Sequence, residues 1–230
     1  SDSEVSALYF GGGAPVRYVK PGATGANDGS SWVDAFTDLQ AALTASNSGD
    51  EIWVAAGTYR PTTNLNDRTA SFTPKAGVKI YGGFAGSETS RSQRDWRLNR
   101  TILTGDLFGN DNANISRTEP TRGENSLHVI NIQNKATEVV LDGLIVTGGN
   151  ADTAVWGSPG DVSNGGGLRL ITSTLTIRNC IFEKNTASKS ACIYGESAGN
   201  TLRIENTIFQ DNVSHSAGTM HVAGNYIIKS

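Results

Sequence analysis

Two carboxylates in a glycine-containing loop are the first residues of this sequence that could do chemistry. Asp106 and Asp111 stand among asparagines in the segment that runs from Gly105 to Asn114. Carboxylate and amide oxygens spaced along such a backbone are the ligands that calcium prefers. The segment lacks the glutamate that closes an EF-hand loop, so two interpretations stay open: a structural calcium site, or ordinary turns without any cofactor.

The same pair is the nearest candidate for a glycoside hydrolase, which needs carboxylates about 5–10 Å apart. A polysaccharide lyase would instead need a base, and a cation or an arginine, beside an acidic sugar. Arg169 and Arg178 are the arginines that could flank such a sugar. Neither arrangement is complete in the sequence, and we assign no catalytic, cofactor-binding or metal-binding residue.

The histidines and cysteines are few. His128, His215 and His221 suggest neither a metal set nor a Ser-His-Asp arrangement, and we expect them at the surface. Cys180 and Cys192 are too few for a disulfide scaffold and lack the partners of a zinc site. We expect Cys180 to pack inward. A bond to Cys192 stays open, because it requires a Cα separation below about 7 Å.

Aromatic side chains could form a platform for stacking sugars if they lay on one face. They are scattered over strand-like and loop-like segments, so we expect them to cover the core or the capping loops instead. The candidates are Trp53, Trp96, Trp156, Tyr59 and Tyr81.

An internal repeat predicts the elements that must position these residues. Residues 175–185 recur 27 positions later as residues 202–212, and a weaker copy begins upstream at Val139. Apolar residues alternate within each copy, as in a strand with one buried face. Short strands with equivalent side chains at equivalent positions can stack about 4.8 Å apart. The sequence therefore predicts a parallel β-solenoid in which Ile177 lies over Ile204.

Asparagines recur at the expected corners of the solenoid. Asn179 and Asn206 follow a buried strand, where asparagine tolerates the left-handed backbone conformation and can bond to its copy in the next coil. Asn185 and Asn212 predict a second such ladder. Glycines are expected to meet the same conformational need in the upstream coil, at Gly143 and Gly149.

One outward column of the predicted strands alternates in charge. It consists of Asp142, Arg178 and Glu205. Opposite charges between stacked neighbours are favourable, although exposed pairs contribute only about 0.2–1 kcal/mol. We interpret the column as setting the register of the strands.

The N-terminal part has a different pattern. Ser31 and Asp34 resemble a capping box, and apolar residues at helical spacing predict an amphipathic helix from Trp32 to Thr44. An alternating strand is expected at 51–55. A solenoid needs its first coil covered, and the helix is expected to be this cap.

The resulting organisation is one all-β domain over residues 1–230. We expect an N-terminal extension or strand at 1–17, the cap helix and first coil at 18–60, and stacked coils at 61–230 with no evident C-terminal cap.

Two sets of segments resemble known bacterial surface proteins. Residues 18–32, 34–43 and 49–59 are similar to the opening of extracellular pectate-lyase-like proteins, and the Leu-x-Ile-x-Asn coils resemble the repeats of polymorphic outer-membrane adhesins. The resemblance implies a right-handed parallel β-helix that is exported, but no particular activity. Those repeats usually carry Gly-Gly-Ala-Ile where this chain has Ser190 to Ile193, which is expected to tighten or shift that coil.

Composition excludes several classes of protein. The 27 glycines among 230 residues and the low apolar content of 37% argue against a helical bundle. A formal charge of -3 without a basic stripe argues against nucleic acid as a partner. No stretch approaches the roughly 18 apolar residues of a membrane span, and the segment from Ser1 to Phe10 does not resemble a signal peptide.

The two ends of the chain suggest a function. Residues 224–227 echo 199–202, so a further coil begins there, and an uncapped coil is a template for strand addition. The segment from Glu4 to Phe10 could supply such a strand. We therefore expect a non-enzymatic extracellular structural or adhesive protein that assembles end to end into fibres. Corner insertions at 106–122 and 155–167 could carry contacts.

The partners expected on this basis are other copies of the chain and a glycan or cell-surface ligand. The alternative functions are a lyase or hydrolase of an acidic polysaccharide and a carbohydrate-binding module for an acidic glycan.

Overall fold

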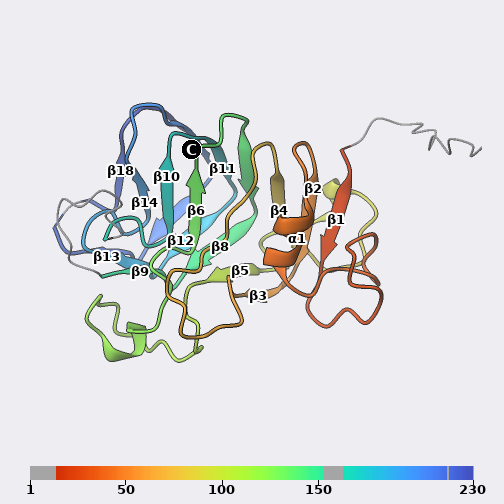
Figure 1. Ribbon diagram of the computed structural model, residues 1–230, viewed down its shortest axis with the longest axis horizontal. Helices are drawn as coiled ribbons and strands as arrows, with labels where there is room; N and C mark the ends of the chain where they lie inside the picture. The colour runs from red at the N-terminus through yellow and green to blue at the C-terminus, as the bar shows by residue number, and fades with distance from the viewer. Residues whose placement is uncertain (1–13, 153–162, 217, 230) are drawn as a thin grey trace, which may run out of the picture.

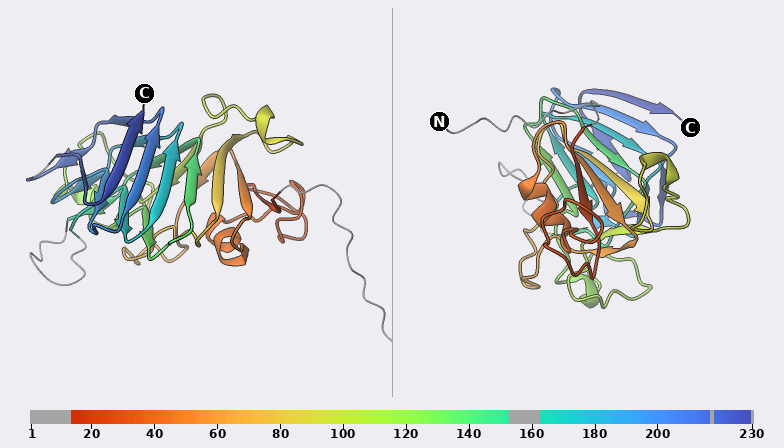
Figure 2. Two further views of the ribbon diagram at one scale, coloured as in Figure 1. Left: turned by 90° about the horizontal axis from the view of Figure 1, so that it is seen from above. Right: turned by 90° about the vertical axis from the view of Figure 1, so that its right-hand side faces the viewer.

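The computed structural model of the protein describes residues 14–152, 163–216 and 218–229. Within these ranges the chain winds into a parallel β-helix (Figure 1), in which every strand pairs in parallel with the equivalent strand of the next coil. Figure 2 shows the strands of one sheet side by side in chain order. The predicted all-β solenoid is confirmed. The expected strand between Glu4 and Phe10, Trp156 and most of the insertion at 155–167 lie outside the described residues.

The strands form four sheets, named A to D here. Sheet A contains β1 (Val16–Val19), β2 (Glu51–Ala55), β4 (Lys79–Phe84), β7 (Val139–Asp142), β11 (Thr174–Arg178), β15 (Thr201–Glu205) and β19 (Asn225–Lys229). Sheet B contains β3 (Gly57–Tyr59), β5 (Thr101–Thr104), β8 (Leu144–Thr147), β12 (Ile181–Glu183) and β16 (Ile208–Gln210). Sheet C contains β6 (Ile130–Gln133), β10 (Leu168–Ile171), β14 (Ile193–Gly195) and β18 (Met220–Val222). Sheet D contains β9 (Asn150–Ala151), β13 (Thr186–Ala187) and β17 (Val213–Ser214).

The register of sheet A confirms the repeat. Leu175 pairs with Leu202 and Ile177 with Ile204, and the upstream copy pairs through Val139. These inward side chains are buried and belong to one continuous apolar core. Like side chains therefore stack on like, because one alternating strand pattern is repeated at a fixed interval.

The first asparagine ladder is present. Asn179 and Asn206 both have a positive φ, of 53° and 42°, and Asn206 Nδ2 donates to Asn179 Oδ1 at 2.7 Å. Gly143 holds the same conformation in the upstream coil, with φ 74°. There Asn179 donates instead to Asp142 Oδ1, at 2.9 Å.

The second ladder is also present, but the prediction of its backbone was wrong by one residue. Asn185 Nδ2 donates to Asn212 Oδ1 at 3.0 Å, whereas the left-handed residues are the preceding ones, Lys184 and Asp211. The glycine with the matching positive φ is Gly148. Gly149 is needed for a different reason, since a side chain there would overlap the carbonyl oxygen of Gly166.

The helix α1 (Leu39–Ala45) is shorter than predicted. Asp38 is the N-cap, and its side chain accepts from Gln40 N, while Ser31 and Asp34 bond to each other in a turn. The segment before Asp38 cannot be helical because Phe36 forms a β-bridge with Val19.

Helix α1 packs against the core in the N-terminal coil, at the side of the coil and not across its open end as expected. Its buried face consists of Leu39, Ala42 and Leu43, which join the cluster that contains Val19 and Ile52. In the end-on view of Figure 2 it lies at the side of the coil. No helix in the described ranges is long and apolar enough to cross a membrane.

The coil at Ser190 is not shifted. Ser190 takes a positive φ of 52°, where the upstream coil has Gly165 with φ 78°. The strands that follow stay in register, with Leu168 paired to Ile193. The substitution of serine for glycine is accommodated by a left-handed residue, and the expected displacement is absent.

Candidate functional site

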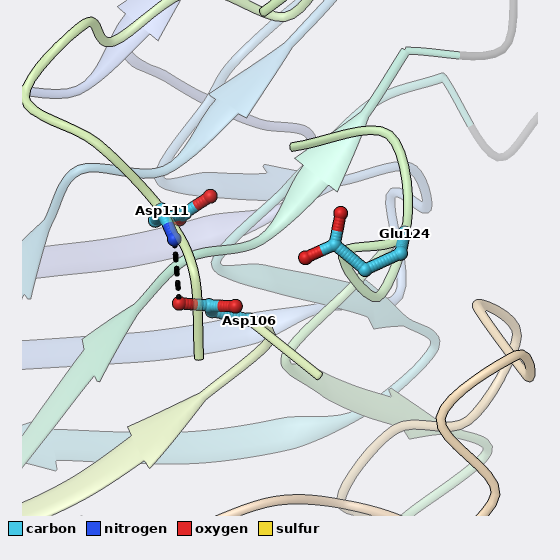
Figure 3. A group of neighbouring side chains, drawn as sticks. All are labelled: Asp106, Asp111 and Glu124. Atoms are coloured by element: carbon cyan, nitrogen blue, oxygen red, sulfur yellow. Dashed lines mark hydrogen bonds between the residues drawn. The ribbon is translucent and has the colours of Figure 1, made fainter. Parts of the chain in front are cut away.

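The insertion between β5 and β6 brings three carboxylates together (Figure 3). One oxygen from each of Asp106, Asp111 and Glu124 lies within 4.8 Å of the others. The predicted proximity of Asp106 and Asp111 is confirmed. Glu124 was missed, because it follows the short 3-10 helix Pro120–Arg122 and no sequence pattern indicates that the chain returns to the loop.

Backbone amides hold the first of these carboxylates. Asp106 Oδ1 accepts from the N–H groups of Gly109 at 2.6 Å and Asn110 at 3.1 Å, and Oδ2 accepts from Asp111 N at 3.2 Å. This Asx-type turn explains why an aspartate begins the loop. It directs the next residues back over the Asp106 side chain.

A buried arginine and a buried asparagine contact the second carboxylate. Arg122 is 1% exposed; it donates to the carbonyl of Lys184 at 2.9 Å and lies 3.2 Å from Asp111 Oδ2. Asn125 is fully buried, and its Nδ2 donates to both Asp111 oxygens, at 3.0 and 3.3 Å. The insertion is thus tied to the solenoid through Asp111.

The cluster carries excess negative charge. Burial raises the pKa of Asp111 to about 6, although Arg122 and Asn125 oppose the shift. Burial also raises the pKa of Glu124, with a smaller contribution from the charge of Asp106. The guanidinium of Arg122 contacts Asp111, and that of Arg60 donates to the backbone carbonyl of Asp106 at 2.9 Å, so two guanidinium groups border the three carboxylates.

The two arginines considered for a lyase lie on different sheets. Arg169 belongs to β10 of sheet C and Arg178 to β11 of sheet A. Arg169 is 6% exposed and pairs with Glu196 at 3.0 Å, while Arg178 pairs with Asp142 at 2.6 Å. They do not flank one sugar, and this geometry argues against the lyase alternative.

The charged column of sheet A is in the predicted register. In the strand register Arg178 lies between Asp142 and Glu205, and Lys229 follows Glu205. The ion pair of Arg178 is with Asp142, whereas the Glu205 carboxylate pairs with Arg203 of its own strand. Asp142 is 2% exposed and is held between Arg178 and Arg94, the latter at 2.7 Å. Because Arg94 belongs to a loop, the column also anchors the 85–100 segment on the sheet.

The aromatic residues mostly cover the core, as expected. Tyr59 is buried within it, and Trp53 and Tyr81 form a second buried cluster with Phe84 on sheet A. Beside this cluster is a hollow of about 700 Å³. It is lined by Ala14, Val16, Glu51, Trp53, Ser90, Arg91, Ser92, Arg94 and Trp96.

One of the three histidine predictions was wrong. His215 and His221 are exposed, but His128 is buried and its Nδ1 lies 3.0 Å from the carbonyl oxygen of Gly165. Cys180 and Cys192 are both buried, and neither is bonded to the other. Cys180 packs in the core, as predicted.

The C-terminal coil forms an open apolar surface. Tyr226, Ile227 and Ile228 of β19 are 61%, 51% and 54% exposed. Within the described residues, β19 pairs only with β15, so its outer edge has no neighbouring strand. A second hollow, of about 390 Å³, lies at this end between β15, β18 and β19.

No protein-family model matches the sequence, and no curated protein or solved structure is detectably similar to it. Any functional conclusion therefore depends on the geometry of the chain itself.

Proposed function

We propose that this protein is a non-enzymatic, exported structural or adhesive β-helix that joins other copies of itself end to end. The proposal agrees with the resemblance to bacterial pectate-lyase-like and adhesin coils. The observation that carries it is the exposed apolar side chains of β19, whose outer edge has no neighbouring strand among the described residues. An unpaired strand edge flanked by exposed apolar side chains is the usual template for strand addition.

The N-terminal edge of sheet A has fewer free backbone groups for strand pairing than the C-terminal edge. Tyr18 N donates to Gly29 O at 3.0 Å, and Tyr18 O accepts from Phe36 N at 2.9 Å, so the outward backbone groups of Tyr18 in β1 are engaged by their own chain. An incoming strand for β19 must therefore come from elsewhere. The segment from Glu4 to Phe10, outside the described residues, is the strand-like candidate in the sequence.

Chain length favours a second copy as the source of this strand. β1 and β19 are the two edges of a seven-stranded sheet. Six spacings of about 4.8 Å place these edges roughly 29 Å apart. From Phe10 to Val16 an extended chain spans at most about 22 Å. The segment cannot reach β19 of its own chain, whereas the segment of a neighbouring copy can.

The test is the oligomeric state of the full chain over a range of concentrations, by sedimentation velocity and electron microscopy. We expect concentration-dependent oligomers and filaments. Ile227→Lys combined with Ile228→Lys should weaken association about tenfold or more, because buried anchor residues of an interface contribute over about 1 kcal/mol each. Deletion of residues 1–10 should weaken it equally.

The matched control is Leu98→Lys, which changes a side chain that is 78% exposed away from the C-terminal coil and should leave association unchanged. A species that stays monomeric at every concentration would refute the proposal. Association that survives deletion of residues 1–10 but not the Ile227 and Ile228 changes would show pairing of two C-terminal coils, which overturns the end-to-end arrangement.

The hollow on sheet A favours a second candidate function, the binding of an acidic glycan. Arg91 and Arg94 offer cationic groups at the hollow, of which the former pairs with Glu51 and the latter with Asp142. Titration with uronate oligosaccharides tests this. Arg91→Ala should weaken binding, whereas Arg203→Ala on β15, outside the hollow, should not. Absence of binding removes this candidate.

A further inference from the structure

We propose that the open C-terminal coil is a binding site for an extended peptide that carries two large apolar residues at alternate positions, followed by glycine. Its natural ligand is the segment 8–12 of a second copy, which lies outside the described residues. This strand lies parallel to β19, with Leu8 over Tyr226 and Phe10 over Ile228. The inference rests on the proposed assembly for the identity of this ligand, and it adds the register and the anchoring side chain.

Two columns of inward side chains in sheet A define what an added strand must supply. In the register of the last two strands, Leu202 lies over Tyr226 and Ile204 over Ile228. Leu202 and Ile204 are buried, whereas Tyr226 and Ile228 are 61% and 54% exposed. The same two columns run through every pairing from β7 to β19. A strand paired with β19 therefore has to provide their next two members.

The hollow of about 390 Å³ at this end selects apolar side chains. Apart from His221, the residues that line it are apolar or aromatic: Leu202, Ile204, Met220, Val222, Tyr226 and Ile228. Removing apolar surface from water is the main favourable contribution to such an association, and a polar side chain placed here would lose its hydration. The two inward residues of the incoming strand should therefore be apolar and large enough to fill the hollow.

The N-terminal segment offers one pair that meets this requirement. Side chains of a strand alternate between its two faces, so a slip of one residue exchanges the inward and outward sets. With Leu8 and Phe10 inward, two large apolar side chains enter the hollow and Tyr9 points outward beside Ile227. With Ala7 and Tyr9 inward, Leu8 and Phe10 would remain in water, and a tyrosine hydroxyl would be buried among apolar groups. The first register is the favourable one.

The corner of the coil favours the same register over one shifted by two residues. The strands β7, β11 and β15 are each followed by a left-handed residue, namely Gly143, Asn179 and Asn206, with φ of 74°, 53° and 42°. In the proposed register the equivalent residue is Gly12, and glycine adopts this conformation without strain. A shift of two residues would place Phe10 there, and a bulky residue rarely adopts a positive φ.

The experiment is calorimetric titration of the dilute full chain with a synthetic peptide of residues 1–13. We expect saturable binding at one site per chain, and an excess of the peptide should suppress the oligomers that form at higher chain concentration. Ile228→Lys in the full chain should abolish binding, whereas Leu98→Lys, at a side chain that is 78% exposed elsewhere, should leave it unchanged. Absence of binding up to roughly 1 mM peptide, a weak affinity for any specific complex, would overturn the inference.

Variants of the peptide test the register. Phe10→Ala should weaken binding at least about tenfold, because a side chain that fills an apolar pocket dominates the affinity of an interface. Tyr9→Ala is the matched control: it removes an aromatic ring one position away, on the outward face, and should change the affinity by less than about threefold. The opposite order of the two peptides, or equal binding by both, would overturn the register. Because a peptide need not fold, lost binding cannot come from a misfolded variant.

The peptide experiment separates this inference from the proposed assembly. A full chain that stays monomeric at every concentration, yet binds the peptide with the expected order of variants, would refute the assembly and support the peptide site. A full chain that forms oligomers but does not bind the peptide would overturn the peptide site and leave the assembly standing. If Ile228→Lys fails to fold, the comparison of the Phe10→Ala and Tyr9→Ala peptides still decides.

Discussion

The two edge strands of sheet A differ in how they are covered. The outer edge of β1 is covered by the chain that follows it, whereas among the described residues no segment covers the outer edge of β19. Beside β1, Phe36 N donates to the carbonyl of Tyr18 and Phe36 O accepts from Lys20 N, and Val19 is fully buried. Over β19 the structure describes no such segment. The strands themselves are built alike, so the difference comes from the connecting chain.

The comparison shows how this fold protects an edge. Residues 20–38 supply both backbone partners and a buried aromatic ring, Phe36, before helix α1 begins. Repeated strands alone cannot protect an edge, because each strand forms backbone hydrogen bonds only with the strands of the coils above and below it. Ile228 in β19 is 54% exposed because, among the described residues, no such segment covers this strand.

The largest effect should come from truncating a stacked core residue. Ile204→Ala should lower the free energy of unfolding by about 2–5 kcal/mol, since Ile204 is buried and a cavity remains. Ile228→Ala, one coil further on, should cost under about 1 kcal/mol because its side chain is half exposed. Urea unfolding monitored by tryptophan fluorescence measures both. Equal losses would mean that the last coil is covered in solution.

The second asparagine ladder should show a smaller difference in stability between an inner and an outer coil. Asn185 is fully buried and donates to Val146 O and Glu183 O as well as to Asn212. Asn185→Ala should cost about 2–3 kcal/mol, because it leaves buried partners unsatisfied. Asn212→Ala, nearer the open end, should cost about 1 kcal/mol. The same urea series checks the order, and a reversed order would contradict the gradient.

The thiols give a contrast that depends on pH. Burial raises the pKa of both Cys180 and Cys192 to about 12. Above about pH 9 the unfolded chain ionises its thiols while the folded chain keeps them protonated, so stability should fall as pH rises. Unfolding curves between pH 8 and 10 test the sign, with Cys180→Ser/Cys192→Ser as the control.

Thiol reactivity locates any fraying of the open end. At pH 8 both cysteines of the native chain should react slowly with a disulfide reagent, because only the thiolate attacks and burial limits access. Cys192 N donates to Thr219 O, so loss of the last coil would expose it first. Rapid labelling of Cys192 alone in the native protein would show that the last coil frays and exposes the coil that contains Cys192.

The sequence predicts the stacked coils well because their signal is local and repeated. Equivalent residues such as Ile177 and Ile204 face the same environment, and the offset between copies fixes the register. The start of α1 was mispredicted, because Phe36 satisfies a helical spacing while its backbone bonds to β1. Tertiary pairing there overrides the helical pattern.

The candidate site was only partly predictable. Asp106 and Asp111 are close in sequence, so their proximity could be inferred. Glu124 and the buried Asn125 join them through the path of an insertion that has no repeat to fix it. His128 was misplaced for a similar reason: it precedes β6, and the burial of that position depends on the next coil, where Gly165 accepts its contact.

The equivalence of successive corners has a consequence for the evolution and engineering of this molecule. Asn179 and Asn206 are 27 residues apart, and the strands before and after these two corners pair residue for residue. An in-frame duplication of one such module would present the same contacts above and below. It would lengthen the rod by about 4.8 Å and keep the apolar columns and the backbone ladder in register. The length of the protein is therefore a quantity that unequal recombination could change in whole steps.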